Sequence, residues 1–429
     1  MALCLWSFST RAEVPENVFA GQLYELLDHD PRILSERNNM SVLESRIEGA
    51  RSGFKPRASI NVEEGKRQIN INSADDVRGG VDTRALTITQ SLFSGFGTLA
   101  DTRAAKARYA AGEAKLTLVE QQVVLEFINA WTDISASWTI LQLNERNVKA
   151  IEKFLKSTKI RYKAQEATIT DMAQSESRLA LAEANYAAAL AAFHKSGENY
   201  RRLTHVDAPE NVVMPPIPVA LPATLEEVDQ TSMDAPAVLQ AIQEEKAAVH
   251  DIDSSTSSLW PEVSLKGSAS ETQAIPTLSG YRHLDDKSLT LNIHIPLYQG
   301  GAEYARIHEA KASRAKAYEE TRNASLETSQ NARRAWHDYQ SSQEVAAAAE
   351  RAAAAARRAL NGVEMEYKDG ARTLLDILDA QSEMINAEIR HTQAQADIRK
   401  NGYALLATTG HLKAQAVSTE PTEHAQKDM

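Results

Sequence analysis

Residues 289–301 read LTLNIHIPLYQGG, and this stretch combines a strand pattern with a turn signal. Over the first nine positions leucine and isoleucine alternate with other residues, the period of two that predicts a β-strand with one apolar face. The Gln-Gly-Gly that follows indicates a turn. From 302 to 368 there is no proline and only one glycine, Gly362, so a single long helix is predicted. At 1.5 Å per residue it would reach on the order of 100 Å.

The same features occur 205 residues earlier, and no gap is needed to align the two segments. Leu86–Leu92 alternates in the same way, a glycine-rich turn follows, and residues 98–164 contain no proline and one glycine, Gly112. One register held across many landmarks indicates an internal duplication. The aligned landmarks are Asp30-Pro31 with Ala235-Pro236, Lys55-Pro56 with Trp260-Pro261, Leu92-Phe93 with Leu297-Tyr298, Tyr162 with Tyr367, Asp171 with Asp376, and Thr204 with Thr409.

Each copy is expected to have the same order of elements: a helix, two strands, and a long helical hairpin. The first helices are predicted at 16–54 and 234–259, and the partner strands at Ala58–Val62, continuing toward Ile71, and Val263–Ser270. Return helices are predicted at 170–203 and 374–407, after turns at 165–169 and 370–373. The chain then divides into a signal-peptide remnant (1–12), a first repeat (13–203), a proline-rich extended connector (204–234), a second repeat (235–410) and a polar, disordered tail (411–429).

Composition excludes several classes of protein. The net charge of −11 gives no support to nucleic-acid binding, which needs a basic face. After the first positions no run of 18 apolar residues exists, so no transmembrane helix is expected. Aromatic residues make up only 6% of the chain, and alanine-rich helices bury little apolar area each. Such a chain is expected to need partner chains or long helix–helix contacts.

The N-terminus resembles the end of a secretory signal. Residues 1–8 (MALCLWSF) are apolar, and a small-residue cleavage site is plausible at Thr10-Arg11-Ala12; the alternative is a frayed terminus. Cys4 is the only cysteine, so neither a disulfide nor a cysteine-based zinc site can form. We do not expect Cys4 to be lipidated, because Leu3 stands where a small residue is normally needed.

Four amphipathic strands cannot close a barrel alone, and an open sheet edge is not tolerated in lipid. Three chains would supply twelve strands, whereas two would supply eight and leave no open lumen. In this interpretation Leu289, Leu291 and Ile293 meet lipid while the residues between them face water. A soluble sheet that packs one face on the helices has the same period of two, so the pattern alone fits both interpretations.

Several motifs together resemble the TolC family of outer-membrane efflux proteins, over about residues 16–412. They are the duplicated halves, Lys55-Pro56 and Trp260-Pro261 before a strand, Leu-Phe-Ser-Gly or Leu-Tyr-Gln-Gly-Gly after the next strand, the segment from Tyr367 to Gln381, and the closing Leu406-Ala-Thr-Thr-Gly410. The resemblance implies an α+β membrane protein in which long helical hairpins form a periplasmic tunnel. It also implies a homotrimer with a twelve-stranded barrel, a periplasmic adaptor and an inner-membrane transporter.

Asp376 and Asp379 lie three residues apart at the start of the last predicted helix, so they share one helix face. In a three-fold tube they would place six carboxylates around one opening, where such a ring attracts cations. The resemblance implies that aspartates at these positions line the periplasmic entrance. The alternative is two solvated acids that the helix dipole favours near a helix N-terminus.

The resemblance further implies a latch that holds the entrance shut. Tyr367 and Arg372 match family positions that bond to the first hairpin, where Thr170 and Asp171 match their partners. An arginine–carboxylate contact is directional, so a few of them per chain can act as a latch. Copy one has Gln165, Ala167 and Gln174 where copy two has Gly370, Arg372 and Asp379, so the acidic, arginine-bearing turn is not duplicated.

We find no nucleophile–base arrangement, cofactor motif or metal-ligand spacing, so an enzyme is not expected. The function predicted is the exit duct of a tripartite export system, with type I protein secretion beside an ABC transporter favoured. The alternative use is multidrug efflux beside a proton-driven pump. A rival from another class is a soluble, elongated coiled-coil scaffold in the cytosol.

Overall fold

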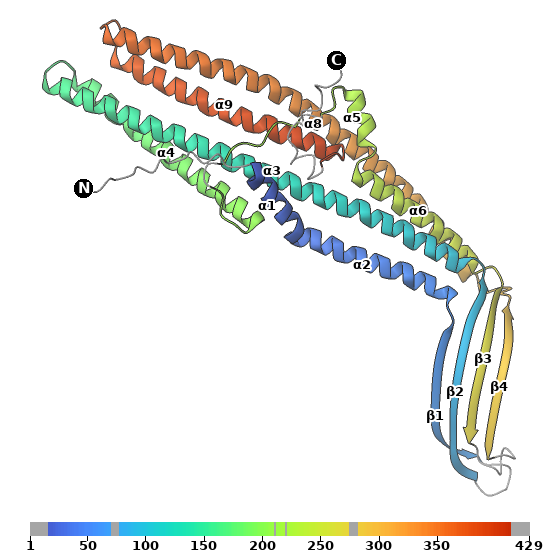
Figure 1. The fold of residues 1–429 in the computed structure, drawn as a ribbon. Helices are drawn as coiled ribbons and strands as arrows, with labels where there is room; N and C mark the ends of the chain where they lie inside the picture. The colour runs from blue at the N-terminus through green and yellow to red at the C-terminus, as the bar shows by residue number, and fades with distance from the viewer. Residues whose placement is uncertain (1–15, 70–76, 210–211, 219–220, 274–281, 413–429) are drawn as a thin grey trace, which may run out of the picture. The chain divides into compact units, whose positions relative to one another are not determined.

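The computed structural model describes residues 16–69, 77–209, 212–218, 221–273 and 282–412 (Figure 1). The predicted signal-peptide remnant and the tail beyond residue 412 lie outside these ranges. The described residues form helices and one four-stranded sheet. No helix in these ranges combines the length and the apolarity needed to cross a membrane.

The elements follow the predicted order in both halves of the chain. The first half contains α1 (Glu16–His29), α2 (Pro31–Arg51), a 3-10 turn (Ser52–Phe54), β1 (Arg57–Ile69), β2 (Val77–Ser94), α3 (Gly97–Lys163) and α4 (Ile169–Thr204). The second contains α5 (Leu225–Ser232), α6 (Pro236–Ser257), β3 (Glu262–Gln273), β4 (His283–His294), α8 (Ala302–Lys368) and α9 (Leu374–Thr408). The long helices α3 and α8 have 67 residues each and confirm the predicted bounds to within one residue.

Three local predictions were wrong. The helix predicted at 16–54 breaks at Asp30, because Pro31 has no N–H to donate and restricts the residue before it. The Asp30 carboxylate instead accepts a bond from the Arg32 backbone N–H at 2.8 Å. The connector is not extended throughout, since it contains α5, which begins where the Thr224 hydroxyl accepts a bond from the Glu227 N–H. Strand β4 ends at His294, two residues before Pro296, which cannot donate to a ladder.

The chain folds into two compact units, and each takes segments from both repeats. Among the described residues, the first unit comes from those within 16–35, 116–236 and 325–412, and the second from those within 36–115 and 237–324. The first unit contains both hairpin turns and a buried aromatic cluster, in which Phe127, Trp131 and Tyr200 have ring centroids 5.9–6.2 Å apart. The second unit contains the sheet.

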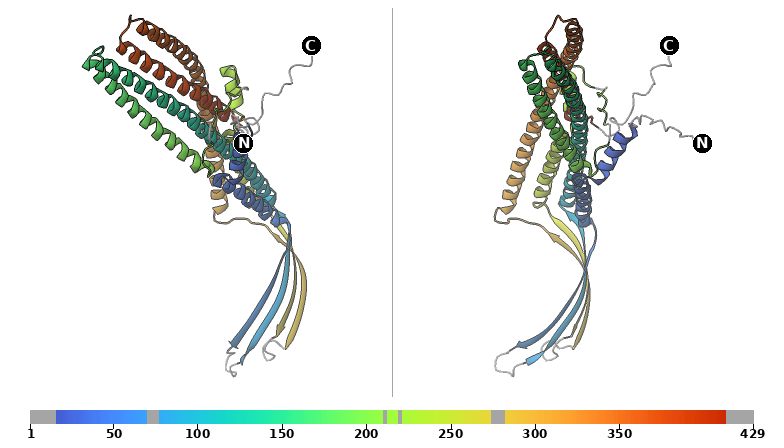
Figure 2. Two further views of the ribbon diagram at one scale, coloured as in Figure 1. Left: turned by 60° about the vertical axis from the view of Figure 1, so that its left-hand side comes forward. Right: turned by 90° about the vertical axis from the view of Figure 1, so that its left-hand side faces the viewer.

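The sheet is antiparallel with the order β1-β2-β3-β4, so β1 and β4 are its edges (Figure 2). Its register places apolar residues in rows on one face: Ile60 opposite Leu86 and then Ala269, Ala58 opposite Ile88, Gly267 and Leu289, and Leu265 opposite Leu291. The other face is polar, and Ser268 bonds to Ser288 across it at 2.7 Å. The predicted alternation is therefore confirmed from 289 to 294.

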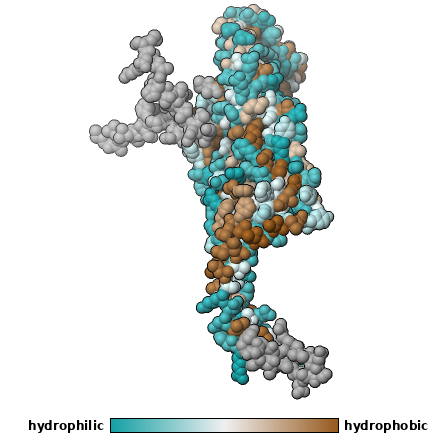
Figure 3. Space-filling model, turned by 90° about the vertical axis from the view of Figure 1, so that its right-hand side faces the viewer, coloured by the Kyte–Doolittle hydropathy of each residue, from teal (hydrophilic) through white to brown (hydrophobic). Residues whose placement is uncertain are grey.

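The apolar face of the sheet is not covered by the chain itself. Ile60 is 73% exposed, Leu289 75% and Leu291 55%, far from the burial usual for such residues. Figure 3 shows hydrophobic surface concentrated near the ends of the strands that join the helices. A contiguous exposed apolar face of this kind marks a surface that another phase or molecule covers.

Candidate functional site

The two hairpin turns share one backbone conformation and lie at the same end of the first unit (Figure 2). Gln165 and Gly370, 205 residues apart, both adopt left-handed φ angles, of 60° and 78°. Paired bonds close both long helices in the same way. In the first turn the backbone N–H of Gln165 donates to the Tyr162 carbonyl at 3.0 Å, and that of Glu166 to the Arg161 carbonyl at 2.8 Å. In the second turn the N–H of Gly370 donates to the Tyr367 carbonyl at 3.0 Å, and that of Ala371 to the Glu366 carbonyl at 2.8 Å.

Each return helix begins with a capping box built on an aspartate. The Asp376 carboxylate accepts bonds from the Thr373 N–H at 2.8 Å and from its hydroxyl at 2.7 Å, and Asp171 accepts bonds from Thr168 in the same way. The backbone bond from Thr373 lowers the pKa of Asp376, and that from Thr168 lowers the pKa of Asp171. One member of the predicted acidic pair and one predicted latch residue therefore fix the starts of α9 and α4.

The structure does not bring Arg372 to Thr170 or Asp171 within the chain. The Arg372 Nε donates to Glu366 on its own hairpin at 2.7 Å, which raises the pKa of the guanidinium. The Thr170 side chain is exposed. Both residues lie at the hairpin turns, as the sequence predicted, but the latch between them stays a prediction.

Three contacts join the two hairpins in their halves nearer the turns, and these pairings were not predicted. The Arg161 guanidinium donates to the Tyr367 hydroxyl and lies 5.7 Å from the centroid of its ring. Arg178 of α4 donates to the Asp379 carboxylate at 2.5 Å. The third contact is buried and neutral: the Gln381 side-chain amide of α9 donates to the Asn147 side-chain Oδ1 of α3 at 3.2 Å.

The two hairpins differ in charge at equivalent positions, which favours the ion pair between Arg178 and Asp379. Residues 155–180 contain five basic and three acidic side chains, whereas residues 360–385 contain two basic and six acidic ones. Arg161 corresponds to Glu366 and Arg178 to Glu383 at the 205-residue shift. The two turns thus have the same backbone conformation and opposite net charge, and the opposite charges favour their attraction.

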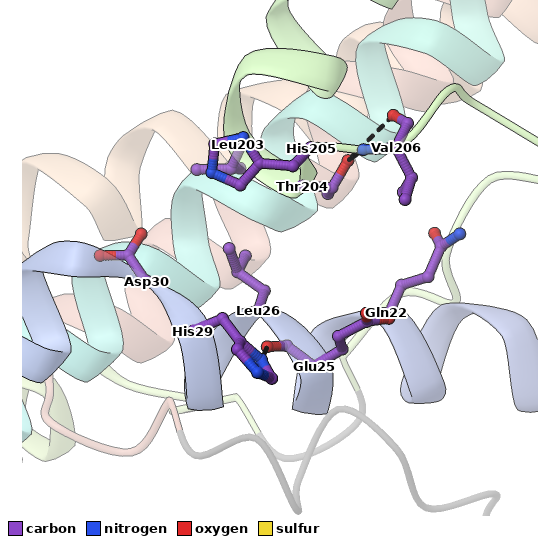
Figure 4. Close-up of a pocket in the computed structure, with 9 residues that line it drawn as sticks. All are labelled: Gln22, Glu25, Leu26, His29, Asp30, Leu203, Thr204, His205 and Val206. Carbon is purple, nitrogen blue, oxygen red and sulfur yellow. Dashed lines mark hydrogen bonds between the residues drawn. The ribbon is translucent and has the colours of Figure 1, made fainter.

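A cleft of about 250 Å³ lies between α1 and the end of α4 (Figure 4). Most small-molecule sites measure roughly 300–1,000 Å³. Several polar groups that line the cleft are already bonded within the chain: a His29 ring nitrogen to the Glu25 backbone carbonyl, Asp30 to Arg32, and the Thr204 hydroxyl to the Val206 carbonyl. We therefore do not regard it as the functional site. Among the described residues no three His, Cys, Asp or Glu side chains form a metal-binding group.

Comparisons with known proteins agree with this architecture. The family described as "Outer membrane efflux protein" matches residues 22–204 and 228–411. The outer membrane efflux protein BepC of Brucella suis is 27% identical over 94% of this chain and 89% of its own. The outer membrane protein TolC of Salmonella enteritidis is 23% identical over 97% of this chain and 86% of its own. The Campylobacter jejuni CmeC outer membrane channel has a similar fold, with a TM-score of 0.79 at 13% identity, over 95% of this chain and 90% of its own.

Proposed function

The chain belongs to the outer membrane efflux protein family, as its resemblance to the TolC family predicted, and we propose that three copies form an export duct across the outer membrane. Membership of this family makes the chain an outer-membrane transport protein with periplasmic helices, and not an enzyme. The trimer, the gate and the partners are the proposed part.

The observation that carries the proposal is the uncovered sheet of the second unit. Its apolar face is exposed, and both edge strands, β1 and β4, have unpaired backbone groups on their outer sides among the described residues. In lipid such edges must be paired. Pairing β1 of one copy with β4 of the next closes a twelve-stranded barrel whose apolar face meets lipid and whose polar face lines water.

The hairpin turns of the first unit are the proposed periplasmic gate. Asp376 and Asp379 would form the acidic ring, with Asp376 held by its capping bonds. Tyr367 and Arg372 would hold the entrance shut against Thr170 and Asp171 of the first hairpin. The contact of Tyr367 with Arg161 supports a role of this tyrosine in joining the hairpins.

For the exported substrate, the proposal is type I secretion of a polypeptide, with a periplasmic adaptor and an ABC transporter as partners. The competing use is efflux of small molecules beside a proton-driven pump, which the name of the relative BepC, an outer membrane efflux protein, favours. Both uses need the same duct, so the inner-membrane partner distinguishes them. Pull-down of the adaptor and identification of the transporter that accompanies it test this choice.

Cell fractionation tests the duct itself. Recovery of a heat-labile trimer from the outer membrane, with ion conductance in planar bilayers, is the expected result. Recovery of the protein from the cytosol would support the rival coiled-coil scaffold and exclude the duct.

A further inference from the structure

Arg178 on the first hairpin forms an ion pair with an acidic residue of the second hairpin. It lies in the third turn of α4, and its guanidinium bonds the Asp379 carboxylate of α9 at 2.5 Å. Both side chains are partly exposed, at 32% and 55%. The bond joins the two hairpins, and the closing bonds of each turn do not depend on it.

The second hairpin has no equivalent of this cation. Copy two has Glu383 where copy one has Arg178, and copy one has Gln174 where copy two has Asp379. Asp376, Asp379 and Glu383 therefore follow one face of α9 at helical spacing. In the described structure Arg178 is the residue that pairs with Asp379, the middle of these three acids.

We propose that Arg178 controls the charge and the resting state of the entrance as the counter-ion of Asp379. While the hairpins are together, Arg178 neutralises Asp379 and contributes to holding them. When the hairpins separate, the pair breaks and the carboxylate is exposed to the opening. The open entrance is then more cation-selective than the closed one, because an unpaired carboxylate attracts cations at a constriction.

This inference rests on the proposed duct function, and planar-bilayer recordings test both. Arg178→Gln removes the counter-ion and leaves the carboxylate, so resting conductance and the cation-to-anion permeability ratio should both rise. Each of these two quantities is expected to rise by up to about five-fold, which corresponds to the free energy of a strong exposed ion pair. Asp379→Asn breaks the same pair but removes the carboxylate, so conductance should rise without a gain in cation selectivity. Arg178→Lys keeps the charge and should stay near the wild type.

The matched control is Lys159→Gln, which removes one positive charge from the same region. Lys159 pairs with Glu176 at 3.4 Å within the first hairpin and does not join the two hairpins. Its conductance should equal that of the wild type. If Arg178→Gln and Lys159→Gln behave alike, the inference is wrong although the duct stands. A protein that inserts as a trimer but conducts in none of the variants, including Arg178→Gln and Asp379→Asn, would refute the duct function itself. The yield of trimer in each preparation separates failed assembly from altered gating.

Discussion

Leu291→Arg tests whether the apolar face of the sheet meets lipid. Leu291 lies beside Leu265 on that face and is 55% exposed in the single chain. An arginine there would be almost free of cost in a soluble protein, where surface substitutions usually change stability by less than about 0.5 kcal/mol. In a membrane it would place a charge within the hydrocarbon.

The expected magnitude follows from the depth of Leu291. Ile295, the first exposed apolar residue beyond β4, is taken as the edge of the apolar band. Leu291 is four residues from it, which is about 13 Å along an extended chain. With a strand tilt of about 40° this is about 10 Å of height, close to the middle of an apolar band about 25 Å tall. Arginine at that depth costs about 2–4 kcal/mol per chain, hence about 6–12 kcal/mol for three chains.

Folding into phospholipid vesicles, followed by urea titration of the assembled protein, measures this cost. The control is Asn292→Arg, the next residue of β4, which lies on the polar face opposite Ser264. We expect a large fall in the urea midpoint for Leu291→Arg and little change for Asn292→Arg. Equal effects of the two substitutions, or a larger effect at Asn292, would refute the assignment of the two faces.

Three further predictions concern the gate and the turns. Combined Tyr367→Phe and Arg372→Gln should raise single-channel conductance, and unchanged conductance would argue against the latch. The pKa of Asp376 is lower in the folded protein than in the unfolded chain. The stability that its capping bonds contribute is therefore complete above the unfolded pKa of about 3.9 and is lost as the pH falls through the folded pKa. Asp376→Asn should weaken the pH dependence of the melting temperature below about pH 4. Gly95 has a left-handed backbone, in which a side chain costs about 1–2 kcal/mol. Gly95→Ala should lower the free energy of unfolding by more than this, because a Cβ there would lie 2.5 Å from a backbone carbonyl oxygen of α6. Its equivalent Gly300→Ala meets nothing within 4 Å and should cost only that penalty in urea unfolding.

Most of the fold could be predicted because its signals are local and occur twice. The strand period of two and the absence of proline over 67 residues are both signals along the chain, and the duplication repeats the strands and the long helices in a second copy. Prediction failed where local signals were weak. The first half of β4, from His283 to Lys287, carries charges in place of apolar alternation, so its pairing with β3 was missed. The helix α5 has only eight residues, too few for a clear period.

The site was predicted less well than the fold because its contacts depend on tertiary structure. The sequence located the turns and identified Asp376, Asp379, Tyr367 and Arg372 there. It did not reveal that Arg372 bonds within its own hairpin or that Asp379 bonds Arg178, since such pairings require the relative position of two hairpins about 200 residues apart. The capping role of Asp376 was open to sequence reasoning, because Thr373 three residues before it completes a capping pattern.

The opposite charges of the hairpins give a physical reason why two copies of one turn can hold each other. Their shared backbone places Arg161 equivalent to Glu366 and Arg178 equivalent to Glu383. Two identical hairpins would present like charges wherever equivalent faces meet, and like-charge neighbours destabilise a contact. Here the basic side chains of the first hairpin meet acceptors of the second, which makes a contact between unlike copies more favourable than one between like copies. In a ring of three chains this preference would alternate first and second hairpins around the opening. In the proposed gate the repeated backbone would therefore supply the geometry, while the few diverged side chains would determine which hairpins close it.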